Sequence, residues 1–282
     1  MYSNESSESY CADLVKQFDP DRYLSTLFAP SEKRAGLFAL YAFNLEIARI
    51  RESVSEPPLG EIRLQFWRDA LGAIYGGQTH EHPVADALAE VVRNSDIPQQ
   101  ALLNLIEART FDLYDDPMPS VNDLEGYLGE TSSILIMLAG RILAGDATTA
   151  ASDAAGHAGV AYGLTGLLRS VPVHRARGQC YLPKDILEAH QTSPAHILSG
   201  RWDGGEQGAL SALYEIAQGH LDKAREVRTQ VPEAALPAFL PVCLVEGYLK
   251  KCMAGNPLEQ VETINPVWRL WRLFRAASRK AY

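Results

Sequence analysis

Apolar residues recur at helical rather than strand spacing along most of this chain. Between residues 31 and 53, for example, Leu37, Leu40 and Leu45 lie on one flank of the segment, which is the pattern of an amphipathic α-helix. Strict alternation of apolar and polar residues, the mark of a half-buried strand, is scarce. The spacing therefore predicts an all-α fold.

Prolines and glycines divide this pattern into separate helices. Pro57 and Pro58 interrupt the first one, and Gly76 with Gly77 stops the second, because proline lacks a backbone donor and glycine favours helix ends. The sequence predicts helices over 31–53, from about 57 to 75, and over 83–93, 98–114, 120–143, 152–171, 206–229, 233–253 and 266–280. The stretch 172–183 is expected to be a loop.

The domain organisation follows from what the chain lacks. It shows no internal repeat, low-complexity tract or composition shift that would mark a linker. The N-terminal residues are polar and acidic. We therefore expect one helical domain over 19–282, preceded by a flexible segment over 1–18.

Charge and cysteine content exclude some classes of function. The net charge of −9 argues against nucleic-acid binding, which usually shows a basic face. The four cysteines stand far apart without a CxxC pair, as in a chain with reduced thiols. The longest apolar run, 134–143, is short for a membrane span and contains Arg141. With no recognisable signal or transit segment, a cytoplasmic location is expected.

The segment YAFNLEIARIRE, residues 41–52, resembles the first active-site motif of the squalene/phytoene synthase family. Catalytic members read approximately YAFCRxxDDxxD, and their aspartates hold magnesium. Here the matching positions are Ala48, Arg49 and Glu52. Alanine offers no oxygen ligand to magnesium, which requires them. Alternatively, Arg49 and Glu52 are simply paired charges on a helix surface.

The segment GLTGLLRSVPVHRARGQCYLP, residues 163–183, resembles the second motif of the same family. Catalytic members carry QLTNxLRDxxED followed by RGRxYLP. Here the first glutamine becomes Gly163, and acidic positions become Ser170 and His174. The resemblance thus implies a degenerate metal site at Ala48, Glu52, Ser170 and His174, without bound metal or cofactor. We expect His174 to be an exposed loop residue.

Basic residues stand where the acids are missing. Arginine can hold phosphate by bidentate hydrogen bonds without a metal, so Arg169, Arg177 and Arg49 are candidates for a direct anion site. Alternatively, these arginines are solvated or pair with the abundant acids.

Four further residues match positions that line the family's cavity. They are Asp112, Tyr127, Tyr181 and Tyr248. With Asp115 and Asp116, Asp112 forms an acidic group that could hold a dication weakly or end a solvated helix. Aromatic residues at helical spacing are usually core, so the tyrosines support the fold more than a reaction.

The segment 266–280 combines apolar and basic residues without any acid. A helical wheel groups Leu270, Trp271, Leu273, Phe274 and Ala277 on one side and five basic residues on the other. Such a helix can lie in an anionic membrane interface, with the contact made through Trp268–Lys280. Equally, it can close the bundle.

Short segments point to one branch of the family. VSE at 54–56, RLQFW at 63–67 and PVH at 172–174 resemble the branch that assists assembly of respiratory complex I and lacks the aspartates. The resemblance implies a pseudo-enzyme at the cytoplasmic face of the inner membrane. Its partners would be complex I subunits or assembly intermediates, with a lipid or isoprenoid possible in the cavity. The alternative is an active head-to-head prenyltransferase with an unusual or metal-independent diphosphate site.

Overall fold

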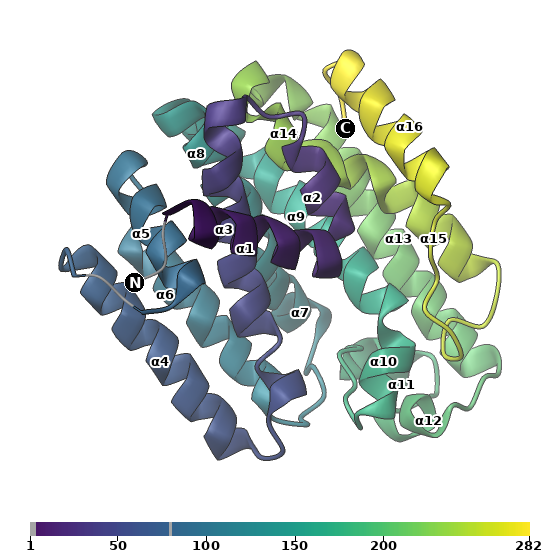
Figure 1. The fold of residues 1–282 in the computed structure, drawn as a ribbon. Coiled ribbons are helices and arrows are strands. Elements are labelled where there is room, and N and C mark those ends of the chain that lie inside the picture. Colours follow the sequence, from purple (N-terminus) through teal and green to yellow (C-terminus); the bar gives the residue numbers. More distant parts are fainter. Residues whose placement is uncertain (1–3, 79–80) are drawn as a thin grey trace.

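A computed structural model describes residues 4–78 and 81–282, which form a bundle of α-helices with no β-strand in those ranges (Figure 1). Short 3-10 segments and one π-helical segment, η3 (Gly129–Ser133), connect or extend the helices. The helices are α1 (Asn4–Phe18), α2 (Pro20–Thr26), α3 (Ser31–Ala48), α4 (Pro57–Tyr75), α5 (Pro83–Asn94), α6 (Gln99–Ala108), α7 (Val121–Leu128), α8 (Ile134–Ala144), α9 (Ser152–Arg169), α10 (Val171–Ala176), α11 (Lys184–Ala189), α12 (Pro194–Ser199), α13 (Gly204–Glu226), α14 (Leu236–Phe239), α15 (Val245–Met253) and α16 (Pro266–Ser278). The predicted all-α fold is confirmed.

Most helix ends follow the proline and glycine signals. Helices α4, α5 and α16 each carry proline in the first turn, where its missing N–H costs nothing. Gly76 ends α4. Helix α13 begins with a capping box, in which the Asp203 carboxylate accepts from the Gly205 N–H and Glu206 reaches back to the Asp203 N–H.

Helix α9 runs through the centre of the bundle and packs on α13, α15, α8 and η3. Glycines make its close approach to η3 possible. A Cβ added at Gly159 would lie 2.2 Å from the Ser133 Cα, and one at Gly163 would lie 2.8 Å from the Leu128 Cδ2. Gly159 and Gly163 therefore serve packing.

Two expectations about irregular segments are wrong. Residues 4–18, expected to be flexible, form helix α1, which packs on α3 and α5 and buries Cys11 and Val15 completely. The expected loop after Pro172 begins with helix α10. Proline at the first turn of a helix is compatible with continuation into a new one, so Pro172 separates α9 from α10 without ending helical structure.

One continuous helical stretch, Val121–Arg169, contains a window long and apolar enough for a membrane span, with a mean hydropathy of 1.4. It comprises α7, η3, α8 and α9 with a 3-10 link, and half of that window is buried inside the bundle. Leu135, Leu138 and Ile142 of α8 are core residues. Helices in the core of a helical bundle can be as long and as apolar as a membrane span.

Candidate functional site

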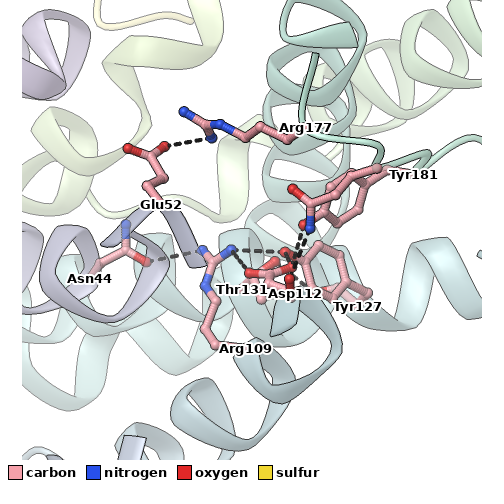
Figure 2. A network of polar contacts seen from close by, with 9 residues as sticks. Asn44, Glu52, Arg109, Asp112, Tyr127, Thr131, Arg177 and Tyr181 are labelled. Atoms are coloured by element: carbon pink, nitrogen blue, oxygen red, sulfur yellow. Dashed lines mark hydrogen bonds and ion pairs between the residues drawn. The ribbon is translucent and has the colours of Figure 1, made fainter. Parts of the chain in front are cut away.

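A buried carboxylate, Asp112, organises the first polar cluster of the interior (Figure 2). Its Oδ1 accepts hydrogen bonds from the hydroxyls of Tyr127 at 2.7 Å and Tyr181 at 2.9 Å. Its Oδ2 lies 3.2 Å from the Arg109 guanidinium. Arg109 also donates to the Tyr127 hydroxyl and, at 3.3 Å, to the Asn44 side chain of α3. We call these five residues the Asp112 cluster.

Burial sets the protonation of this cluster. It raises the pKa of Tyr127 and of Tyr181, so both hydroxyls keep their protons and donate to Asp112. Burial alone would lower the pKa of Arg109, but the neighbouring Tyr127 and Asp112 outweigh it and raise that pKa. The guanidinium therefore stays charged and neutralises the carboxylate. Asp112, Tyr127 and Tyr181, which the family resemblance named as cavity-lining candidates, thus lie together in one buried cluster.

The three neighbouring acids do not converge. Asp112 turns inward, whereas Asp115 and Asp116 are exposed, and Asp115 pairs with Arg51 at 3.2 Å. Among residues 4–78 and 81–282, no group of three or more His, Cys, Asp or Glu side chains is placed to hold a metal ion.

Glu52 and Arg177 bridge the ends of the two motif segments above the Asp112 cluster (Figure 2). The Glu52 carboxylate lies 3.0 Å from Arg177 and 3.4 Å from Arg49. Ala48 is in the last turn of α3, and Ser170 is the residue between α9 and α10. The single carboxylate among the four predicted metal positions is thus engaged by two arginines.

His174 is not the exposed loop residue that we expected. It lies in α10 with its ring 4.6 Å from the ring of Tyr181. Burial lowers its pKa to about 4, and the charge of Arg177 adds to the lowering. At neutral pH this side chain is an uncharged imidazole beside the Asp112 cluster.

A second buried carboxylate, Asp21 of α2, organises another polar cluster. The Tyr248 hydroxyl lies 2.8 Å from its Oδ2, and the Arg269 Nε lies 3.0 Å from its Oδ1. Arg169 lies over the Tyr248 ring, 3.5 Å from its centroid. Burial and the nearby Asp19 raise the pKa of Asp21, while Arg269 acts in the opposite direction.

Helices α3 and α9 face each other through this region. The buried guanidinium of Arg22 lies between the rings of Tyr41 on α3 and Tyr162 on α9, at 5.5 and 5.1 Å from their centroids. Asp19 pairs with Arg22 at 2.7 Å. Tyr41 of α3 and Tyr162 of α9 thus approach the same guanidinium, and charged and aromatic side chains occupy the space between the two motif helices.

The candidate arginines do not form one anion site. Arg169 belongs to the Asp21 cluster, where its Nε donates to the Glu262 carbonyl. Arg49 lies over the Phe18 ring, 3.5 Å from its centroid, and lines a hollow of about 400 Å³ bordered by α1, α3 and α4. Arg177 pairs with Glu52. Direct anion binding by these residues stays a prediction.

Sequence reasoning missed Arg109 and Asp21, each of which belongs to one of the two clusters, and also Arg22, which lies beside the rings of Tyr41 and Tyr162. None of the three was predicted as a site residue. A signal existed for Arg109, which stands three residues before Asp112 and so shares its helix face. The pairing of Asp21 with Arg269 joins positions far apart in the chain, and helical spacing carries no information about such a contact.

The buried and exposed sides of helix α16 differ from those that the helical wheel predicts. Leu273 is fully buried, and Arg269 and Arg272 point into the bundle, Arg272 donating to the Cys243 carbonyl at 2.9 Å. The solvent-facing side instead carries apolar residues: Val267, Leu270, Trp271 and Phe274. We call these four the α16 outer face. The prediction that Leu273 shares their side is wrong, because Leu273 follows Trp271 by about 200° around the helix.

Comparison with known proteins agrees with this architecture. Residues 15–272 match the sequence profile of the squalene/phytoene synthase family. A dehydrosqualene synthase crystallised with a ligand superposes with a TM-score of 0.86 at 17% identity, covering 98% of this chain and 97% of that one. A squalene synthase from Alicyclobacillus acidocaldarius superposes with a TM-score of 0.77 at 19% identity, covering 88% and 93% of the two chains.

Curated relatives are closer in sequence. NADH dehydrogenase (ubiquinone) complex I, assembly factor 6, from Homo sapiens is 33% identical over 282 residues, covering 98% of this chain and 83% of the relative. The Bos taurus protein is 36% identical, covering 87% and 73%. A 15-cis-phytoene synthase from Synechocystis is 26% identical, covering 90% and 79%. The chain belongs to the squalene/phytoene synthase family.

Proposed function

We propose that this protein is a non-catalytic member of its family that assists assembly of the respiratory NADH dehydrogenase complex. Its sequence carries the proposal: identity with complex I assembly factor 6 is 33–36% over most of both chains, against 26% for a phytoene synthase. Its partners would be subunits of that complex or assembly intermediates.

The candidate site supports a loss of magnesium chemistry. Magnesium bound to substrate phosphates is held by one or two protein carboxylates together with waters, and Ala48, Ser170 and His174 supply no carboxylate. Glu52 is held by Arg177 and Arg49. A dication entering beside Glu52 would have to displace these two guanidinium groups.

Packing supports the same proposal. Catalytic members place glutamine at the position of Gly163, according to the resemblance of the second motif. Here a Cβ at that position would lie 2.9 Å from the Ser132 Cβ, so the backbone approach leaves no room for a longer side chain. The α9–η3 contact is thus adapted to glycine.

Deleting the gene from its host is expected to lower the amount of assembled complex I and to leave carotenoid and hopanoid content unchanged. Native gel electrophoresis with an NADH dehydrogenase activity stain measures the first, and chromatography of lipid extracts measures the second.

In parallel, the purified protein with farnesyl or geranylgeranyl diphosphate and magnesium is expected to yield no product, with an active dehydrosqualene synthase as positive control. Formation of squalene, dehydrosqualene or phytoene would establish the prenyltransferase alternative.

We further propose that the protein works peripherally on the cytoplasmic face of the membrane, through the α16 outer face. The exposed fraction of its apolar residues ranges from 49% at Leu270 to 74% at Val267. Arg275 stacks on Trp271 at the edge of this face, 5.1 Å from a ring centroid. Lys250 and Lys251 border a pocket beside Trp268, at the start of the helix. Apolar residues flanked by cations are suited to an anionic lipid surface.

Serine at Leu270, Trp271 and Phe274 together is expected to abolish sedimentation of the protein with phosphatidylglycerol vesicles, because the side chains that would enter the interface are removed. The matched control is serine at Leu59 and Ile62, which are as exposed on α4. Equal binding by both variants and by the wild type would contradict the assignment of this surface. If the wild type binds uncharged phosphatidylcholine vesicles as well as phosphatidylglycerol vesicles, the flanking cations do not contribute to membrane binding.

A further inference from the structure

Three side chains from different helices form a hydrogen-bonded row outside the two buried clusters. The Nδ1 atoms of His157 on α9 and His220 on α13 lie 3.0 Å apart. The other ring nitrogen of His220, Nε2, lies 3.0 Å from the Glu125 carboxylate on α7. The His220 side chain is 13% exposed and Glu125 38% exposed, so the row opens to solvent at an edge of the bundle.

The carboxylate fixes the tautomer of His220. Glu125 is an acceptor, so Nε2 of His220 must carry the proton that it receives. In the neutral ring, Nδ1 of His220 then holds a lone pair directed at His157. The neutral His157 ring then has two options: the Nδ1–H tautomer donates to His220, whereas the Nε2–H tautomer leaves a second lone pair on Nδ1.

We propose that His157 and His220 form a binding site for a zinc-class divalent cation, with Glu125 as the positioning residue of His220. Two nitrogens bound to one tetrahedral zinc at 2.0–2.1 Å lie about 3.3 Å apart. The two Nδ1 atoms are thus within a few tenths of an ångström of that separation. A carboxylate on the outer nitrogen of a histidine ligand is the common support of such sites, since it orients the ring and raises its basicity.

The surrounding charges act in both directions. Asp153 stands four residues before His157 on α9, so it shares the helix face, and its negative charge favours a cation beside His157. Lys223, on α13, repels a cation, and its charge adds to burial and to His220 in lowering the pKa of His157. A low pKa keeps His157 neutral near pH 7, which metal binding requires. With two histidines, water completes the coordination, so we expect a moderate affinity.

Calorimetric titration of the full chain with zinc chloride at neutral pH tests the site. One ion is expected to bind per chain. His220→Gln and His157→Gln, which each remove a ligand, are expected to weaken binding by more than the roughly tenfold that loss of an outer-shell partner costs. Glu125→Ala should weaken it less, and Glu125→Gln, which can still accept from Nε2, less again. His190→Ala is the matched control and is expected to leave binding unchanged.

Absorption spectroscopy with cobalt(II) provides a second measurement that does not depend on calorimetry. The visible absorption of cobalt(II) is expected to show nitrogen ligation in the wild type and to lose it in His220→Gln, with circular dichroism confirming that each variant is folded. Absence of zinc binding by the folded wild type would overturn the proposal. So would binding that is unchanged in the folded double variant His157→Gln/His220→Gln. If His157 and His220 only share a proton, the stability of the protein depends on pH but neither zinc binding nor cobalt absorption is observed. That result also overturns the proposal.

Discussion

Replacing Gly159 by alanine is expected to lower the free energy of unfolding by about 3 kcal/mol, the upper part of the usual range for overpacking. The added Cβ would lie 2.2 Å from the Cα and 2.5 Å from the N of Ser133. Both are backbone atoms of the π-helical segment η3, so no change of side-chain rotamer relieves the overlap. Urea denaturation followed by circular dichroism measures the loss.

Gly156 provides the matched control on the same helix. A Cβ there would meet nothing within 4 Å, so Gly156→Ala is expected to stabilise the protein by about 0.5–1 kcal/mol through helix propensity. If the two alanine variants have equal stability, the close contact between α9 and η3 is not required for the fold. The two substitutions are expected to change the free energy of unfolding in opposite directions, so a general effect of alanine in helices cannot account for the difference.

Helices and their ends were largely predictable because their causes are local. Proline in the first turn, capping residues and apolar spacing act within about four residues, and α4, α5 and α13 follow them closely. Helix α1 was missed because its polar, acidic beginning resembles a disordered end. Its stability comes from Cys11 and Val15, which are buried against other helices.

The candidate site was predictable only in part. Asp112, Tyr127 and Tyr181 were identified by resemblance to the family, and the structure places them in one cluster. Their cation, Arg109, and the whole arrangement around Asp21 depend on contacts between separate helices. The orientation of α16 was mispredicted for a related reason. A sequence rich in both arginine and apolar residues suggests that arginine faces water, but the buried Asp21 draws Arg269 inward.

Replacing Arg109 by methionine is expected to lower the free energy of unfolding by about 3–5 kcal/mol, the usual cost of removing one partner from a buried ion pair. Methionine keeps much of the side-chain volume, so the effect reports the charge. The Asp112 side chain would then keep only the hydrogen bonds of Tyr127 and Tyr181. Thermal and urea unfolding measure the change. Arg93→Met, which breaks the exposed pair with Glu90, is the control and should cost less than about 1 kcal/mol.

A double-mutant cycle separates this charge effect from loss of packing. Asp112→Asn alone leaves the Arg109 guanidinium without its counter-charge, and is expected to be destabilising as well. The combined variant Arg109→Met/Asp112→Asn removes both charges, so its cost should fall short of the sum of the single costs by about 1–3 kcal/mol. Additive costs would mean that the two charges do not stabilise each other. In that case the cluster would be held by the tyrosine hydrogen bonds alone, and Asp112 would stay buried for reasons independent of Arg109.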